Sequence, residues 1–205
     1  MSAEDAPQSR DSNLVLGPMR TSVALVPLCL FACAPAERPV QGADSPSVPN
    51  ANPSWAVQAD SFGPLPLGVP IAQAESALGS AILARMPELD GCSEVRPPAL
   101  PSGTSLMIIR DVGTPVTVER VDVHTAGVRT REGVGVGDAE DSVLAVYRGR
   151  VQVQPHKYTG PEGHYLVVTH PRDTVFLIIF ETDGRHVTRF RAGRKPAVQY
   201  VEGCA

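Results

Sequence analysis

Large aliphatic and β-branched residues are concentrated after about residue 60 of this chain, so only that part can build a hydrophobic core. The preceding residues are instead rich in Ala, Pro, Ser and Asn. A segment of that composition cannot bury enough apolar surface to offset the entropy it would lose on ordering. The sequence therefore predicts one folded domain over residues 63–205, preceded by an extended tether over residues 33–62.

A short apolar segment precedes the tether and ends at a cysteine. Arg20 supplies one positive charge, and the apolar run of about a dozen residues that follows is too short to span a bilayer but suits a signal peptide. Residues 30–33, Leu-Phe-Ala-Cys, resemble the lipobox of bacterial lipoproteins. We therefore predict a signal peptide over residues 19–32 and a lipid anchor at Cys33.

Two points about this end of the chain have alternatives. Ordinary cleavage at the small residues 34–36 competes with lipidation at Cys33. Residues 1–18 are polar and lack the character of a signal peptide, so we interpret them as an extension upstream of a true start at Met19. Lipidation would place the domain in the cell envelope, on the extracytoplasmic side of a bacterial membrane.

The domain contains two cysteines, Cys92 and Cys204, once Cys29 and Cys33 are assigned to the targeting segment. In an oxidising compartment the simplest prediction is one disulfide between them. Closing so long a loop would stabilise the fold by about 4 to 5 kcal/mol in the chain-entropy description. The alternative is a pair of buried free thiols.

Two stretches of the domain resemble each other, residues 67–79 and residues 136–147. Each opens with an apolar residue and a glycine, followed by small or apolar residues at helical spacing. Further along, residues 118–121 align with residues 187–190, a shift of 69 positions. The common order of these matches predicts an internal duplication. We therefore expect an α+β fold of two tandem units, about 63–130 and 131–205, each a helix followed by antiparallel strands, which form one domain and share one sheet or core.

Several segments have the β-branched and alternating character of strands. Residues 174–180 are continuously apolar, which indicates a central strand buried on both faces. Asp183-Gly184 is a strong hairpin signal directly after that strand. The predicted strands are residues 105–111, 116–124, 151–155, 164–170, 174–181, 186–192 and 198–201.

Tandem units of about 70 residues that open with an apolar-Gly step into a helix resemble the β-lactamase inhibitor protein and the small lipoproteins of the outer-membrane barrel-assembly machinery. The resemblance covers residues 63–205 as a pattern and includes no diagnostic motif. It implies a domain that acts by binding proteins, and it transfers no catalytic residue.

The most distinctive stretch is the turn-rich segment 155–165, which joins two predicted strands. Loops that carry aromatic and donor side chains often form binding surfaces. The predicted contact residues are His156, Lys157, Tyr158 and Tyr165. The alternative is an ordinary hairpin loop whose tyrosines pack on the sheet edge.

Charge and motifs argue against several other functions. Residues 63–205 contain 15 Lys and Arg against 16 Asp and Glu, a net charge of −1, which does not favour a nucleic-acid partner. His164 and His170 lie too far apart along one predicted strand to share a metal ion, and no cofactor motif is complete. The sequence contains no Gly-x-Ser-x-Gly motif of the kind that carries the nucleophile of many hydrolases.

The sequence therefore predicts an envelope lipoprotein with a non-catalytic domain that binds a protein or glycan partner, without metal or cofactor. The alternatives are a small extracytoplasmic hydrolase that uses His156 or His164, and a structural envelope protein.

Overall fold

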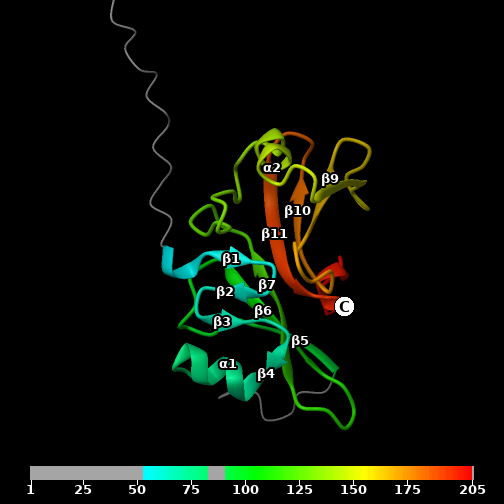
Figure 1. Ribbon diagram of the computed structural model, residues 1–205. Helices are drawn as coiled ribbons and strands as arrows, with labels where there is room; N and C mark the ends of the chain where they lie inside the picture. The colour runs from blue at the N-terminus through cyan, green and yellow to red at the C-terminus, as the bar shows by residue number, and fades with distance from the viewer. Residues whose placement is uncertain (1–52, 83–90, 205) are drawn as a thin grey trace, which may run out of the picture. The chain divides into compact units, whose positions relative to one another are not determined.

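The computed structural model describes residues 53–82 and 91–204 (Figure 1). Its first part contains short elements: a 3-10 helix η1 (Pro53–Trp55), strands β1 (Val57–Gln58), β2 (Ser61–Phe62), β3 (Leu65–Pro66) and β4 (Val69–Pro70), and helix α1 (Ile71–Leu78). Strands β5 (Gly91–Val95), β6 (Thr104–Arg110) and β7 (Thr117–Val123) follow. The last part contains α2 (Glu140–Val146), β8 (Val151–Pro155), β9 (His164–Thr169), β10 (Phe176–Thr182), β11 (Val187–Arg194) and the 3-10 helix η2 (Ala197–Gln199).

One large antiparallel sheet organises the described residues. Its strand order is β5-β6-β7-β11-β10-β9-β8, with β4 paired to β7 as the eighth strand. The last strand, β11, pairs with β7 through partners such as Phe190 and Val123. Strands from both ends of the domain sequence therefore form one continuous sheet. A separate three-stranded sheet, β1-β2-β3, lies beside it.

The predicted fold class of two helix-plus-sheet units is wrong. The described residues form a mainly β domain with two short α-helices, of 8 and 7 residues, an eight-stranded sheet and a three-stranded sheet. The helical spacing did mark both helices, but each ends after about two turns. The prediction fails because strands dominate: the pairing of β7 with β11 joins the strands of both predicted units into one large sheet, and the two short helices are only a small part of the domain.

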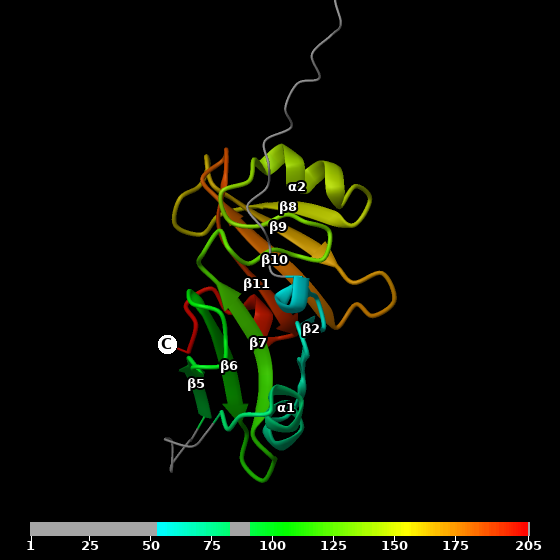
Figure 2. The ribbon, with the colours of Figure 1, turned by 90° about the vertical axis from the view of Figure 1, so that its left-hand side faces the viewer.

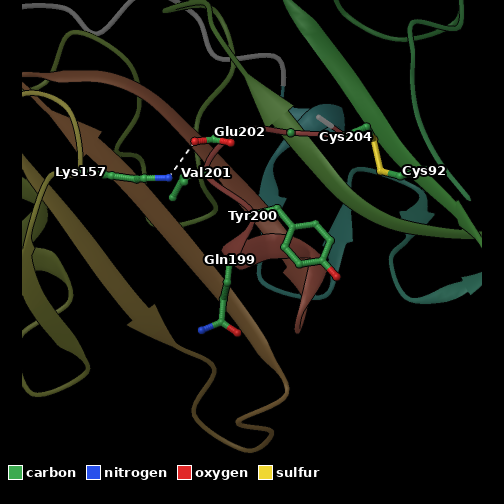
Figure 3. A pocket seen from close by; sticks show the side chains of 8 residues that line it. Cys92, Lys157, Gln199, Tyr200, Val201, Glu202 and Cys204 are labelled. Atoms are coloured by element: carbon green, nitrogen blue, oxygen red, sulfur yellow. Dashed lines mark hydrogen bonds and ion pairs between the residues drawn. A yellow bond between two sulfur atoms is a disulfide. The ribbon is translucent and has the colours of Figure 1, made fainter.

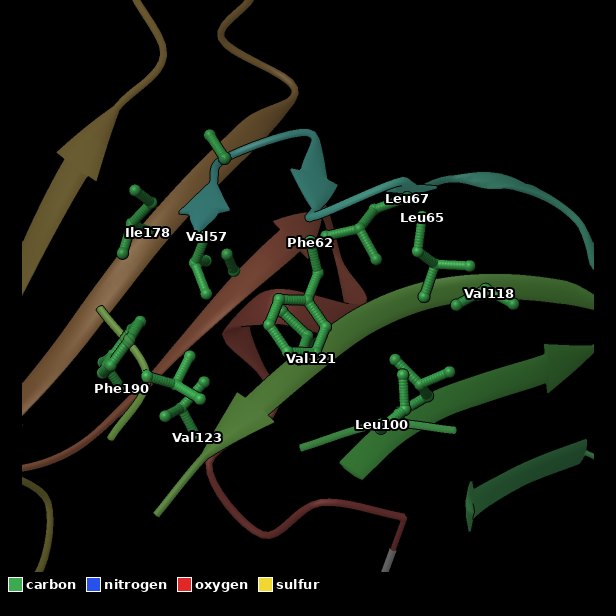
Figure 4. Close-up of a cluster of buried hydrophobic side chains, with 14 of the residues drawn as sticks. Val57, Phe62, Leu65, Leu67, Leu100, Val118, Val121, Val123, Ile178 and Phe190 are labelled. Atoms are coloured by element: carbon green, nitrogen blue, oxygen red, sulfur yellow. The ribbon is translucent and has the colours of Figure 1, made fainter. Parts of the chain in front are cut away.

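The main hydrophobic core lies between one face of the large sheet and the N-terminal strands. Phe62 and Leu65 from β2 and β3 pack over Val118 and Val121 of β7, and Phe190 of β11 continues the cluster (Figure 4). All five side chains are almost completely buried. Because strand side chains alternate between faces, the same strands present a second set of residues to the opposite side.

The second face of the sheet carries Arg120, Asp122, Glu181, Arg189 and Arg191, as the pairing register requires. A C-terminal segment, defined here as residues 195–204, covers part of this face and contributes Val198 to a small apolar cluster with strand residues. The three-stranded sheet and α1 therefore lie on one side of the large sheet, and the C-terminal segment on the other (Figure 2).

The folded domain begins earlier than the sequence indicated. Residues 53–62, assigned to the tether, form η1, β1 and β2. The Trp55 and Phe62 rings lie 4.9 Å apart between centroids, so the tryptophan packs on the domain. Strands β1 and β2 have only two residues each, which is too short for an alternating pattern to indicate them. The predicted signal peptide, Cys33 and the rest of the tether lie outside the described residues.

Six of the seven predicted strands are present with small shifts at their ends. Strand β10 is buried on both faces, as its apolar run predicted. The turn after it contains Asp183, whose carboxylate accepts the backbone N–H groups of Arg185 and His186. The seventh prediction, residues 198–201, is wrong, because this stretch forms η2 and a turn. Within residues 53–82 and 91–204, no helix is long and apolar enough to cross a membrane.

Candidate functional site

Two buried arginines hold the C-terminal segment on the second face of the sheet. Arg120 donates from Nη1 to the carbonyl oxygens of Ala197 and Tyr200, at 2.9 and 2.7 Å. Arg191 donates from Nε to the carbonyl oxygen of Val198 at 2.7 Å. No strand of the described part of the chain pairs with this segment, and the guanidinium groups supply hydrogen bonds that a neighbouring strand would otherwise provide.

Covalent and ionic contacts fix the end of the same segment (Figure 3). The predicted disulfide between Cys92 and Cys204 is present and joins the segment to β5, with the two Cα atoms 5.3 Å apart. Glu202 accepts a hydrogen bond from Lys157 Nζ at 2.7 Å and another from the Tyr158 hydroxyl. The C-terminal segment is therefore anchored both to the edge strand β5 and to the loop between β8 and β9.

Glu181 is the centre of an ionic cluster on this face, and its side chain is only 2% exposed. Its carboxylate accepts hydrogen bonds from Arg191 and, at 2.7 Å, from Arg189. The ring of His156 lies 3.0 Å from the same carboxylate. Burial by itself would raise the pKa of Glu181, but the hydrogen bonds from Arg189 and His156 and the charge of Arg191 outweigh it, and the pKa lies below its ordinary value.

A smaller ion pair extends this cluster along the sheet. Arg120 Nε donates to Asp122 at 2.7 Å, and both side chains are nearly buried. Arg191 lies beside this pair on the neighbouring strand, opposite Asp122 in the β7–β11 register. Burial lowers the pKa of Arg191, and the carboxylate of Glu181 opposes that shift. Charge balance on this face therefore depends on both carboxylates.

Two hollows flank the end of the C-terminal segment and share Val201, Glu202 and Gly203 as walls. One, of about 410 Å³, is lined by polar and charged side chains that include Tyr158 and Arg189. The other, of about 440 Å³, includes Lys157 and Tyr200. Arg189 keeps 41% of its side chain exposed although its Nε is bonded to Glu181, and Tyr158 is 57% exposed. This combination leaves aromatic and cationic groups accessible on a rigid support.

The four predicted contact residues separate into two pairs. Lys157 and Tyr158 are exposed beside the C-terminal segment. Tyr165 is buried, and its ring stacks on that of His156 with centroids 4.4 Å apart. The His156 side chain is only 8% exposed. His156 and Tyr165 are therefore part of the packing beneath the loop, and a partner could reach only Lys157 and Tyr158 without rearrangement.

The other candidate base, His164, forms a different arrangement. Its Nδ1 lies 3.0 Å from Glu140 Oε1, and the Thr182 hydroxyl donates to the same carboxylate. The carboxylate thus lies between the hydroxyl and the imidazole, whereas a nucleophilic triad needs the imidazole between them. His156 likewise contacts a carboxylate, and no serine or threonine hydroxyl bonds to its ring among the described residues.

Residues 53–82 and 91–204 contain no group of three or more His, Cys, Asp or Glu side chains placed to hold a metal ion. No protein-family model, curated protein or solved structure matches the chain. The resemblance to β-lactamase inhibitor protein and to the barrel-assembly lipoproteins therefore stays a prediction that no comparison supports.

Sequence reasoning missed most residues of this site. Nothing in the sequence around Glu202, Arg120 or Arg191 indicates their contacts. These contacts depend on where residues 195–204 cross the sheet. Arg189 and Arg191 alternate with apolar residues along β11, a pattern that usually indicates a strand face exposed to solvent. The structure instead buries Arg191. Only the disulfide pointed to the C-terminal segment, since it places Cys204 against β5.

Proposed function

We propose that this protein is a lipid-anchored protein of the bacterial cell envelope that binds a protein partner through the second face of its large sheet. The binding surface is formed by Lys157, Tyr158, Arg189 and Tyr200 around the end of the C-terminal segment. The observation that carries the proposal is this group of accessible tyrosines and cations on a covalently anchored platform.

The composition of the surface favours a protein partner. Tyrosine and arginine are enriched in the energetically dominant positions of protein interfaces, because both bring large contact area and directed hydrogen bonds. Tyr158 and Tyr200 are 57% and 41% exposed, and the hollows beside them provide concave surface. The disulfide and the hydrogen bonds from Arg120 and Arg191 hold the backbone of the C-terminal segment in place before a partner binds. Less conformational entropy is therefore lost on binding.

Two features support the envelope location. The disulfide between Cys92 and Cys204 suits an oxidising compartment outside the cytoplasm. The apolar segment that ends in the lipobox-like residues 30–33 supplies both export and anchoring. The intact mass of protein purified from membranes tests this part: we expect an acylated chain that begins at Cys33, whereas an unprocessed chain would contradict it.

Site-specific photocrosslinking in the native host tests the binding surface. A photoreactive phenylalanine analogue replaces Tyr158 in one variant and Tyr200 in a second. The matched control carries it at Val112, which is 98% exposed and lies in the connection between β6 and β7. Far-UV circular dichroism confirms that each variant folds.

We expect Tyr158 and Tyr200 to crosslink to the same protein, and the control position not to. Substitution Y158A combined with R189A should then weaken binding of that purified partner by about tenfold or more, because it removes an aromatic and a cationic contact. Crosslinks equally strong at Val112, or none at either tyrosine, would contradict the proposed surface. If a purified envelope glycan bound the wild type directly and failed to bind Y158A/R189A, the partner would be a glycan and the proposal of a protein partner would be wrong.

A further inference from the structure

A cavity of about 410 Å³ lies on the core side of the sheet, away from the surface described above. Its apolar lining includes Ala59, which follows β1, Val168 of β9 and Ile178 of β10, each no more than 4% exposed. Val168 and Ile178 are paired neighbours in the β9–β10 register. The cavity therefore has a rigid, apolar floor formed by the sheet itself.

Three arginines line the same cavity from three separate segments. The backbone N–H of Arg131 donates to the Val57 carbonyl at 2.9 Å, which holds Arg131 beside β1. The N–H of Arg150 donates to the Tyr147 carbonyl at 2.9 Å, and its guanidinium lies 5.3 Å from the centre of the Tyr147 ring. Arg172 comes from the loop between β9 and β10.

The cavity contains one carboxylate, Glu132, and that carboxylate already has partners. It accepts the Tyr147 hydroxyl at 2.8 Å, and its other oxygen lies 3.9 Å from Arg150. No hydrogen bond or ion pair joins the guanidinium group of Arg131 or of Arg172 to any other side chain that the structure describes. With three arginines and one glutamate, the lining has a formal charge of +2, whereas residues 63–205 together have a net charge of −1.

His170 and Tyr147 also line the cavity and carry donor groups. His170 Nδ1 accepts the backbone N–H groups of Arg172 and Asp173, so a neutral ring carries its proton on Nε2. Burial raises the pKa of the Tyr147 hydroxyl, which keeps it protonated and bonded to Glu132. The carboxylate is thereby occupied by a neutral donor, and the arginines remain the charged groups available to a ligand.

We propose that this cavity binds a small soluble organic anion, whose carboxylate or phosphate is held by Arg131 and Arg172 while its apolar body rests on the floor of the cavity. Guanidinium groups bind such anions through paired charge-assisted hydrogen bonds. The volume lies within the range of ligand pockets, and an apolar floor with a few convergent polar groups is their usual composition. The site is independent of the proposed protein-binding surface.

Titration of the oxidised full-length chain with phenyl phosphate tests the proposal, with binding followed by ³¹P NMR. Variant R131A/R172A removes the two arginines that have no side-chain partner among the described residues. The matched control, R148A, removes an exposed arginine that follows α2 but does not line the cavity. Inorganic phosphate serves as a probe that has the charge but no apolar body.

We expect saturable binding of phenyl phosphate to the wild type, weakened by about tenfold or more in R131A/R172A and by less than about twofold in R148A. Inorganic phosphate should bind about tenfold more weakly than phenyl phosphate, because it gains nothing from the floor. The absence of saturable binding up to about 10 mM phenyl phosphate would overturn the proposal. Equal weakening in R148A, or equal affinity for both probes, would overturn it as well.

Discussion

Replacement of Glu181 by glutamine tests whether the ionic cluster on the second face holds the fold together. The substitution keeps the shape of the side chain and removes its charge. Glu181 is 2% exposed and Arg191 is 5% exposed, so neither can be rehydrated without local opening. Arg191 keeps its bond to the Val198 carbonyl in the variant but loses the only carboxylate to which it is hydrogen-bonded among the described residues.

The expected loss follows from this burial. Removing one partner of a buried ion pair leaves an uncompensated charge and costs about 3 to 5 kcal/mol. The nearby charge of Arg120 adds to the repulsion that Arg191 experiences. In a domain of this size each kcal/mol shifts the melting temperature by about 2 to 4 °C, so E181Q should melt roughly 10 °C below the wild type. Arg189 contributes little to this loss, because it is 41% exposed and can be solvated.

The assay is urea unfolding of the oxidised protein followed by circular dichroism, with a thermal melt as a second measurement. E119Q is the matched control: Glu119 is 5% exposed like Glu181, but its partner Arg194 is 43% exposed and can be solvated when the charge is lost. We therefore expect E119Q to lose about 1 kcal/mol or less. If E181Q lost no more than E119Q, the burial of the arginine would not determine the cost, and the reasoning would be refuted.

Three further predictions concern the same face. The pKa of Glu181 is lowered in the folded state, so the ionised carboxylate stabilises the fold at pH values above its ordinary pKa of 4.5. This stabilisation is lost as the pH falls through the pKa of the folded state. The difference in unfolding free energy between wild type and E181Q should therefore become smaller in urea titrations at acid pH. A constant gap down to about pH 2 would contradict this assignment. The double variant C92S/C204S opens a 112-residue loop and should lose up to about 5 kcal/mol in the same urea assay, whereas an unchanged midpoint would show that the segment is held without the disulfide. The buried Tyr165 hydroxyl has no hydrogen-bond partner among the described residues, so Y165F should be neutral or slightly stabilising in urea unfolding, and a loss above about 1 kcal/mol would indicate a bond to that hydroxyl.

The strands could be predicted from the sequence because their signals are local. Strand β10 is a continuous apolar run and proved to be buried on both faces. The two helices were also marked by their spacing. The way in which the strands join was not predictable, because the β7–β11 ladder pairs Val123 with Phe190, and nothing in either segment specifies a partner so distant in sequence. The two-unit α+β prediction failed because the helices have only 8 and 7 residues and the described residues form a mainly β domain.

The candidate site was less predictable for a related reason. The loop 155–165 was identified by its aromatic and cationic residues, but composition does not tell which of them point inward. Register decides this: Tyr165 pairs with Glu181 in the β9–β10 ladder and therefore faces the ionic cluster. His156 follows the end of β8 and stacks on Tyr165. Lys157 and Tyr158 come next in the loop and stay outside it.

The two faces of the sheet explain why one domain can carry two separate sites. The first face is covered by the N-terminal strands and supplies most of the apolar burial, which is the main stabilising contribution in any such fold. Among the residues that the structure describes, residues 195–204 cover part of the second face, and carbonyl groups of this segment accept hydrogen bonds from Arg120 and Arg191. The packing of the main core does not depend on the exposed edge of residues 195–204. Substitutions around this edge can therefore alter partner binding without unfolding the domain. The basic cavity beside Ile178 uses the other side of the same strands, so occupation of one site leaves the other accessible.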